Sequence, residues 1–449
     1  MEEPLNLSML PPEILLQIFL NIPAKECVRS VSLVCSLFYQ TLKDGNWWTQ
    51  RKKKQQIVLN PKEEEQESFA LDMLVCSAEA DDRRWRALPF QKMYSFNAHF
   101  GTVNAARLFV DSDGGRRCIS AGRDRQIRLW DLDQFMEDQD GRPAQSTVRE
   151  GASTAPGPSS HFTSTELLTR SDRSELLHHV DEAHTGWIWR VTRPNTCTSF
   201  YSSGWDSLVK RWDITPSGFK HSGDIGLGSA VIGLEWVDGS EEELVCSTFL
   251  RRVCVLDARE GLAVVQEQTK HSRAVIGVLS KDNYIYSWSE DKLICLSDRR
   301  NMNIPVAEYK FPRSYAHQLS IGTTSLTAVT AKGGACHFLN PHTLEDWGSY
   351  IVHEQASKAS KLSPSPLPDP VRGIVNTGGS LVFLSKFGKV DALSYGLKPR
   401  SLMQSVDLGG EPSRTDYRDG ELVAAVGDGR LIFWPRPSQE HFDAADLAL

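Results

Sequence analysis

The sequence predicts two parts, a short helical segment at the N-terminus and a large all-β region that starts near residue 90. In the first fifty residues, apolar side chains recur at helical spacing. After Pro89, short β-branched and aromatic runs alternate with Gly, Asp, Asn and Ser, as strands joined by tight turns do. Within this second part a segment ending in Trp-Asp recurs, which indicates a repeat architecture.

Composition limits the class of protein. The 449 residues carry a net charge of −7, which argues against general binding to nucleic-acid phosphates or to anionic membranes. No apolar run approaches the roughly 18 residues of a membrane helix, and the acidic start followed by Pro11-Pro12 does not read as a signal peptide. The nine cysteines form no CxxC pair, so we expect free, mostly buried thiols, no metal and no cofactor. The expected location is the cytoplasm, the nucleus or both.

The N-terminal segment reads as helices. Pro11-Pro12 suits a helix start, because proline fits the first helical turn. A second helix is predicted between Pro23 and Asp44. One apolar face is expected on each, formed by Ile14, Leu15, Ile18 and Phe19 on the first and by Val28, Val31, Val34, Cys35 and Phe38 on the second. These apolar residues are too many for so small a core, so some should remain exposed as a partner surface.

The same segment resembles an F-box. LPPEIL at 10–15, VCSLF at 34–38 and the tryptophan pair at 47–48 follow the order and spacing of that motif, over residues 1–51. The resemblance implies three helices that dock on the Skp1 adaptor of a cullin–RING ubiquitin ligase. By analogy the residues that contact Skp1 are Leu10, Pro11, Ile14, Ile18, Phe19 and Pro23. Residues 52–89, first highly charged and then helical in pattern, are predicted to be a helical linker.

The repeats are plainest in two segments, Ala98–Leu132 and Ala183–Ile214. Each opens with Ala-His, and each has an Asp six residues before its Trp and a Ser four residues before that Asp. Weaker copies follow at steps of 41 to 54 residues and end at Trp434, which gives seven units. Two inserts, 133–174 and 356–370, and a tail, 436–449, are rich in polar residues or in Gly, Pro, Ser and Thr. We expect the inserts to be flexible and the tail to be disordered.

A period near 40–45 residues that ends in Trp-Asp resembles the WD40 repeat, with four strands per blade. The resemblance implies a seven-bladed β-propeller over residues 90–435, with the orphan run Lys92–Phe96 completing the last blade. It also implies a structural hydrogen-bonded relay of His99, Ser120, Asp124 and Trp130 in one unit and of His184, Ser202, Asp206 and Trp212 in the next. We expect the imidazole and the indole to donate to the buried carboxylate.

Ser, His and Asp together also suggest a hydrolase. A catalytic set would be unique, whereas this one recurs at a fixed period and lacks the sequence context of a nucleophilic serine, so the structural interpretation is favoured. The third unit has lost the relay, with Leu250 and Leu256 in place of Asp and Trp. Its blade must be held by apolar packing.

The residue before the relay aspartate is expected at one mouth of the propeller. Two adjacent units place the aromatic residues Trp205 and Phe249 there. Cations at or near this position complete the candidate substrate-binding set, which is Arg123, Trp205, Phe249, Arg251, Lys332 and Lys386. Exposed aromatics beside cations suit an extended peptide with one apolar anchor and acidic or phosphorylated neighbours. The alternative is a solvated mouth without a ligand.

The combination of F-box, helical linker and WD repeats is similar to the F-box/WD-repeat substrate receptors of SCF (Skp1–cullin–F-box) ubiquitin ligases. The resemblance implies a subunit without covalent chemistry, which holds a protein substrate for ubiquitination and degradation. An alternative is a Skp1-bound scaffold with a non-degradative assembly role. An enzyme is disfavoured, because the sequence has no metal-ligand spacing, no P-loop and no unique nucleophile–base pair.

Overall fold

The structure is a computed structural model of the 449 residues. It describes residues 10–22, 24–43, 47–51, 93–140, 176–194, 198–215, 218–238, 242–259, 261–322, 326–330, 335–351, 371–376, 381–386, 388–394, 401–418 and 420–435, together with Leu7 and Ser240. The predicted linker 52–89, the insert 356–370, the tail 436–449 and most of the insert 133–174 lie outside the described residues.

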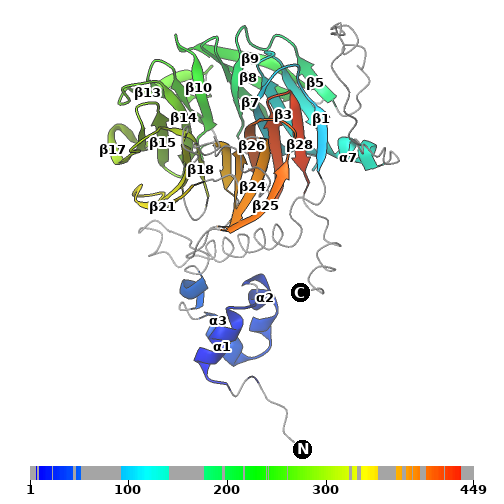
Figure 1. Cartoon of the computed structure of the whole chain (residues 1–449), viewed down its shortest axis with the longest axis vertical. Coiled ribbons are helices and arrows are strands. Elements are labelled where there is room, and N and C mark those ends of the chain that lie inside the picture. Colours follow the sequence, from blue (N-terminus) through cyan, green and yellow to red (C-terminus); the bar gives the residue numbers. More distant parts are fainter. Residues whose placement is uncertain are drawn as a thin grey trace, which may run out of the picture.

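Short helices open the chain: α1 (Pro12–Phe19), α2 (Ala24–Arg29), η2 (Val31–Leu33) and α3 (Ser36–Lys43) (Figure 1). α1 begins at the predicted place, since Pro12 fills the first turn, where a backbone N–H would have no partner. The prediction of one continuous second helix is wrong. The backbone leaves helical geometry at Ser30, with φ −121° and ψ −55°, and α2, η2 and α3 follow one another instead.

These helices share an apolar core of their own. Its buried members are Leu15, Leu16, Phe19, Ala24, Cys27, Phe38, Leu42 and Trp47. The Phe19 and Phe38 rings meet edge to face with centroids 5.1 Å apart. Arg51 covers the Trp47 ring at 4.9 Å and donates from Nη1 to the Phe19 carbonyl at 2.9 Å, which ties the end of the segment to α1.

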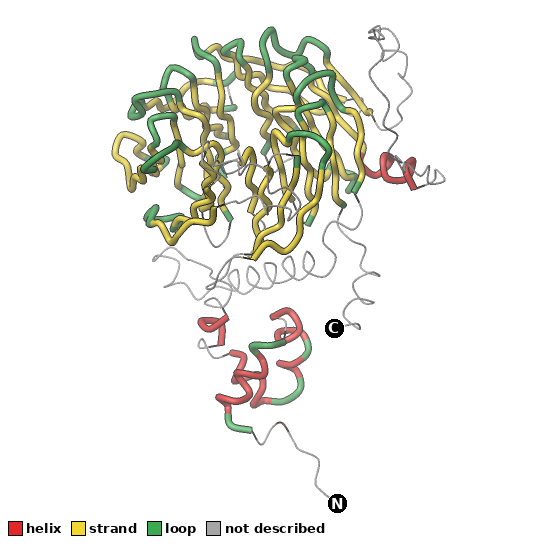
Figure 2. Tube along the Cα trace, viewed as in Figure 1, coloured by secondary structure: helices red, strands yellow, loops and turns green. Residues whose placement is uncertain are grey.

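Antiparallel four-stranded sheets make up most of the rest of the described chain (Figure 2). Six of them take four consecutive strands each. The first sheet consists of β2 (Val103–Val110), β3 (Arg116–Gly122), β4 (Ile127–Asp131) and β5 (Leu176–Val180). The second sheet consists of β6 (Ile188–Thr192), β7 (Ser199–Gly204), β8 (Leu208–Thr215) and β9 (Gly218–Gly226). The third sheet consists of β10 (Val231–Trp236), β11 (Glu243–Thr248), β12 (Val253–Asp257) and β13 (Ala263–Gln268). The fourth sheet consists of β14 (Val275–Lys281), β15 (Tyr284–Ser289), β16 (Leu293–Asp298) and β17 (Asn301–Lys310). The fifth sheet consists of β18 (Ala316–Ile321), β19 (Leu326–Thr330), β20 (Ala335–Leu339) and β21 (Asp346–Ile351). The sixth sheet consists of β22 (Val371–Asn376), β23 (Leu381–Lys386), β24 (Lys389–Ser394) and β25 (Ser401–Asp407).

The seventh sheet joins the two ends of the all-β region. It consists of β26 (Pro412–Arg418), β27 (Glu421–Val426), β28 (Arg430–Trp434) and β1 (Tyr94–Asn97). β1 pairs with β28 from Tyr94↔Phe433 to Asn97↔Arg430, so the predicted pairing of the run before His99 with the last unit is confirmed. The pairing covers an edge of β28 that would otherwise be open.

The innermost strands of successive sheets contact one another. β2 contacts β6, and the contacts continue through β10, β14, β18 and β22 to β26, which in turn contacts β2. Apolar clusters fill the spaces between sheets; one, for example, joins Ile119 and Leu129 of the first sheet to Val191 and Trp212 of the second. The core therefore runs between the sheets.

One turn recurs at the same place in the repeat. The residue after the aspartate position has a positive φ in six sheets: Arg125 (68°), Ser207 (69°), Arg251 (67°), Lys292 (72°), Gly388 (70°) and Gly429 (93°). Most residue types avoid this left-handed conformation. Its recurrence agrees with the repeat frame read from the sequence.

The start of the first predicted insert is ordered, which corrects the prediction that flexibility begins at residue 133. Helix α7 (Leu132–Asp140) follows β4 directly. The Asp131 carboxylate accepts from the backbone N–H groups of Asp133 and Gln134, both at 3.0 Å, and so caps the helix. Phe135 is buried against Phe96 of β1, with ring centroids 4.4 Å apart.

Candidate functional site

The first repeat brings together its four predicted relay residues. His99 Nδ1 lies 2.8 Å from the Asp124 carboxylate, and His99 Nε2 lies 2.7 Å from Ser120 Oγ. Trp130 Nε1 donates to the same serine oxygen at 2.8 Å. The expectation that the indole donates to the aspartate is wrong, because the serine stands between them. The carboxylate instead accepts from the backbone N–H groups of Phe100 and Gln126, both at 3.2 Å.

The second repeat has the same arrangement. His184 lies 2.9 Å from Asp206 and 2.7 Å from Ser202, and Trp212 donates to Ser202 at 2.8 Å. A third set lacks the tryptophan: His271 lies 3.2 Å from Asp291 and 2.9 Å from Ser287.

Electrostatics in the first and the third of these sets favour a neutral imidazole beside a carboxylate. Burial lowers the pKa of His99 and of His271 below the usual 6.5, although the adjacent aspartates act in the opposite direction. Burial alone would raise the pKa of Asp124, but hydrogen bonds from His99 and from the backbone hold that pKa below 3.8. Ser120 is fully buried and already hydrogen-bonded to two rings, so it has no path to a substrate. The arrangement suits structural stabilisation.

In the third sheet, apolar and thiol groups occupy the relay positions. Leu256 stands where tryptophan does in the first two repeats and is fully buried. Cys246 pairs across the strands with Cys254, and both thiols are buried. Their mutual contact and burial raise the pKa of Cys246 well above its usual value.

The turn before each aspartate position is fixed to the loop that precedes the inner strand. In five sheets the backbone N–H of the turn residue donates to a carbonyl of that loop. These pairs are Arg123 to Thr102 (2.9 Å), Trp205 to Trp187 (2.8 Å), Phe249 to Ala230 (2.9 Å), Glu290 to Ala274 (3.1 Å) and Gly427 to Glu411 (2.7 Å). Side chains at these turns are therefore held at one end of the sheets.

The structure places Trp205 and Phe249 together, with ring centroids 5.9 Å apart. Sequence reasoning missed two neighbours, Trp187 and Leu250. Trp187 lies in the loop that accepts the Trp205 backbone N–H, and the Arg123 guanidinium lies over its ring at 4.8 Å. All four apolar side chains are between 45% and 59% exposed. The signal for Trp187 was its position three residues after His184, in the loop that meets the turn.

The remaining predicted substrate contacts are placed in part. Arg251 is exposed in its left-handed turn. Lys332 lies outside the described residues, and Lys386 ends β23 with no description of its side chain. Glu290, at the same turn position in the fourth sheet, is half-buried.

The residues predicted to contact Skp1 on the N-terminal helices differ in solvent exposure. Pro11 and Ile14 are exposed, and Leu10 and Ile18 are half-buried. Phe19 is buried in the helical core, so the structure contradicts its assignment to a contact surface. Pro23 lies outside the described residues. Leu33 and Val34, 79% and 68% exposed, were missed because a continuous second helix would have placed Val34 on a buried face.

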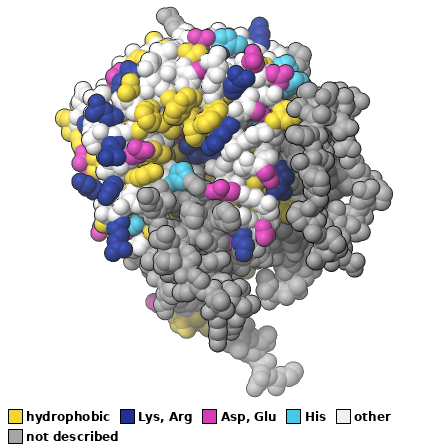
Figure 3. All heavy atoms as spheres, turned by 45° about the horizontal axis from the view of Figure 1, so that its top comes forward, with side chains coloured by type: hydrophobic (Ala, Val, Ile, Leu, Met, Phe, Trp, Pro, Cys, Tyr) yellow, Lys and Arg dark blue, Asp and Glu magenta, His cyan; other side chains and the backbone are white. Residues whose placement is uncertain are grey.

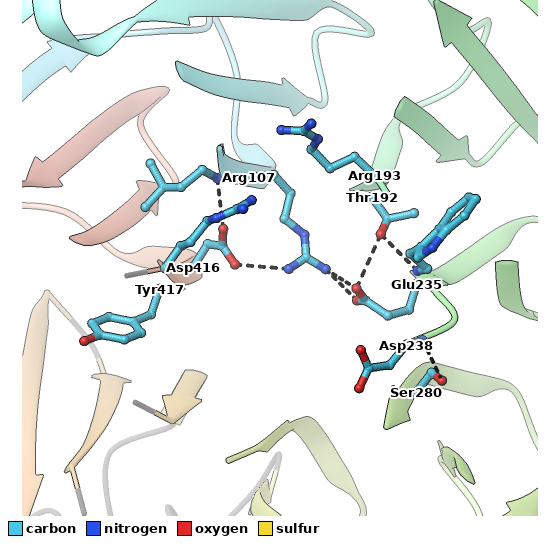
Figure 4. A pocket seen from close by; sticks show the side chains of 11 residues that line it. Arg107, Thr192, Arg193, Glu235, Asp238, Ser280, Asp416 and Tyr417 are labelled. Carbon is cyan, nitrogen blue, oxygen red and sulfur yellow. Dashed lines mark hydrogen bonds and ion pairs between the residues drawn. The ribbon is translucent and has the colours of Figure 1, made fainter. Parts of the chain in front are cut away.

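A polar cavity of about 430 Å³ opens where several inner strands meet (Figure 4). At its centre, Arg107 on β2 reaches Glu235 on β10 at 2.5 Å and Asp416 on β26 at 3.1 Å. Burial disfavours this charge, but the two carboxylates outweigh the burial and raise the pKa of Arg107. Arg107 pairs with both carboxylates, so this cluster links the first sheet to the third and the seventh.

Other classes of site have no support in the described part of the chain. There, no three His, Cys, Asp or Glu side chains gather in a way that could hold a metal ion. The helices described are too short or too polar to traverse a lipid bilayer.

Comparison with known proteins agrees with this geometry. A family model described as F-box-like matches residues 7–53, and one described as WD domain, G-beta repeat matches residues 90–131. F-box/WD repeat-containing protein mec-15 of Caenorhabditis elegans is 28% identical over 435 residues, which are 95% of each chain. F-box/WD repeat-containing protein 9 of Homo sapiens is 29% identical over 301 residues, which are 66% of this chain and 56% of that protein.

Solved structures resemble the chain in fold. The crystal structure of RRP9 WD40 repeats aligns with a TM-score of 0.58 at 15% identity, over 78% of this chain and 98% of the other. The structure of U3-55K aligns with a TM-score of 0.57 at 14% identity, over 77% and 99%. The sheets are thus of the WD40 β-propeller type. With an F-box-like segment ahead of WD repeats, the chain is a homologue of the F-box/WD repeat-containing proteins.

Proposed function

We propose that this chain is the non-catalytic substrate receptor of an SCF ubiquitin ligase. In this role the N-terminal helices dock on Skp1, cullin and RING subunits follow, and the β-region captures a protein substrate for ubiquitination and degradation. The observation that carries the proposal is a set of exposed apolar residues on helices that match an F-box and precede WD repeats. The receptor would accelerate ubiquitination by holding the substrate close to the ligase.

The proposal includes the finer architecture. Residues 1–51 would form a three-helix F-box, and the seven sheets would form a closed seven-bladed propeller. Support comes from the inner-strand contacts, which return from β26 to β2, and from the pairing of β1 with β28. The cytoplasm and the nucleus are the proposed locations.

The adaptor surface would centre on Pro11, Ile14, Leu33 and Val34. These side chains project away from the helical core, and water exposure of so many apolar groups is unfavourable in an isolated segment. Burial against an apolar groove of Skp1 would remove about 25 cal/mol of unfavourable free energy per Å². Leu10 and Ile18, half-buried, would border this surface.

Pull-down of Skp1 by the full-length chain tests the assignment. Ile14→Asp places a charge in the proposed apolar interface and should reduce retained adaptor at least about tenfold. The matched control is Val306→Asp, an equally exposed aliphatic residue on β17. Equal retention of Skp1 by both variants and the wild type would refute the assignment.

A second candidate is a Skp1-bound WD-repeat scaffold with a non-degradative role. This scaffold would bind Skp1 through the same surface as the receptor. The two functions differ only in whether the bound protein is degraded. Purification of the chain with cullin and RING subunits, followed by measurement of co-purified protein half-lives with and without Ile14→Asp, separates the two. Partners that bind but turn over at the same rate favour the scaffold.

A further inference from the structure

We propose that Trp187, Trp205, Phe249 and Leu250, here called the aromatic turn patch, bind an unmodified protein segment in which one bulky apolar side chain lies between carboxylates. The inference rests on the proposed receptor function and names its substrate class. On the face of the sheets shown in Figure 3, apolar side chains gather beside Lys and Arg side chains.

The patch spans two neighbouring sheets, and two of its aromatic rings are in contact across them. The ring centroids of Trp205 and Phe249 are 5.9 Å apart, and the ring of the half-buried Trp189 lies 6.3 Å from that of Trp205. Turn positions usually carry polar residues, because they face water. Four large apolar side chains at two adjacent turns and the loop beside them therefore indicate a surface that is covered during function.

Hydrogen bonds fix the backbone of these turns before any ligand binds. The Trp205 N–H donates to the Trp187 carbonyl at 2.8 Å, and the Leu250 N–H donates to Ser229 Oγ at 3.0 Å. Between the two loops Gly186 allows a close approach, since a Cβ there would lie 2.8 Å from the Asp206 backbone nitrogen. A rigid patch loses little conformational entropy on binding.

Leu250 differs from the residue type that three other sheets carry at this turn position. It stands where three other sheets place the relay aspartate, namely Asp124, Asp206 and Asp291. Those carboxylates bind a histidine and backbone N–H groups, whereas Leu250 is 59% exposed. An exposed leucine in place of a hydrogen-bonded aspartate extends the apolar surface of Phe249.

Two arginines near the patch determine which residues of the bound segment fit beside its apolar side chain. Arg123 lies over Trp187, and Arg251 is exposed in the same turn as Leu250. Neither has an ion pair within the described part of the chain. A phosphate dianion needs several converging donors, whereas these two cations come from turns of the first and third sheets and suit one carboxylate each. A basic segment would meet like charge from both arginines.

An array of short peptides probes the class directly with the full-length chain. The central residue is Leu, Met, Phe, Trp or Ser, and the flanks are Glu, Lys, Ser or phosphoserine. Peptides with an apolar centre and Glu flanks should be retained best. Trp205→Ala with Phe249→Ala should weaken their binding about tenfold or more. Arg123→Glu should weaken it most at low ionic strength, where attraction is least screened.

Two variants keep the test independent of folding. Leu250→Asp restores the residue type of the other relays, so it should melt like the wild type and still bind these peptides several-fold more weakly. Trp347→Ala removes an exposed tryptophan from β21, outside the patch, and should bind like the wild type.

The outcomes separate this inference from the receptor proposal. No preference for apolar over serine centres, or equal binding by the patch variants, overturns the inference while Skp1 binding stands. Tighter binding of phosphoserine flanks overturns the carboxylate assignment. Loss of Skp1 binding in the wild type overturns the receptor proposal even if peptide selectivity survives.

Discussion

Arg107 Nη2 on β2 lies 2.5 Å from Glu235 Oε2 on β10, so one side chain links the first sheet to the third past the second. The same guanidinium reaches Asp416 of the seventh sheet, and its Nε donates to the Val191 carbonyl of the second at 3.3 Å. Four sheets thus share one cation, which acts as a brace where the inner strands meet (Figure 4).

Arg107→Ala should lower the free energy of unfolding by about 1.5–3 kcal/mol, because it removes the guanidinium hydrogen bonds to two half-buried carboxylates. Thermal or denaturant unfolding measures the change. The control is Arg259→Ala, whose ion pairs with Glu242 and Asp257 lie at an exposed site and should matter little. Equal melting of the two variants would show that the brace is not energetically important.

Asp124→Ala and Asp206→Ala should each destabilise the fold by about 1–3 kcal/mol, because each leaves a buried imidazole N–H without its acceptor. Asp428→Ala is the comparison. That carboxylate occupies the same repeat position but is partly exposed and contacts Arg430 at 2.7 Å, so its loss should have a smaller effect. An equal loss in all three would contradict the importance of the His–Asp contact.

The melting temperature should fall as pH drops below about 6.5. Burial lowers the folded-state pKa of His99 and His271 below 6.5, so the unfolded chain takes up protons first. Their stabilising contribution is therefore complete above pH 6.5 and is lost as the pH falls toward the lower folded-state values. The lowered pKa values of Asp124 and Asp206 predict a second loss below about pH 3.8.

Calorimetry from about pH 8 to about pH 5 measures the first of these losses. A melting temperature that is constant or rises over this interval would contradict the neutral, buried state of the two relay histidines.

The sequence predicts the features that repeat along the chain. It does not predict the features that depend on contacts between residues far apart in the sequence. The Trp-Asp period placed the turns after Asp124 and Asp206 and the strand that completes the last sheet, since a fixed period is visible without coordinates. The brace of Arg107 joins residues more than a hundred positions apart and leaves no local pattern. Exposure of Leu250 was likewise invisible, because its position predicted only the loss of a relay.

Helix α7 offers a direct test of where the first insert starts. Phe135 is 2% exposed and packs against Phe96 at 4.4 Å and Tyr94 at 5.9 Å, both on the strand that completes the seventh sheet. Phe135→Ala should therefore cost about 3–5 kcal/mol through lost burial and a residual cavity.

Deletion of residues 141–165, by contrast, should leave the melting temperature nearly unchanged, because Gly, Pro, Ser and Thr supply 15 of those 25 residues and little apolar surface. The two changes lie close together in the sequence, so differential scanning calorimetry of both locates the boundary of the folded core. A wild-type melting temperature for Phe135→Ala would mean that α7 does not support β1. A large decrease for the deletion would mean that the core extends past Asp140.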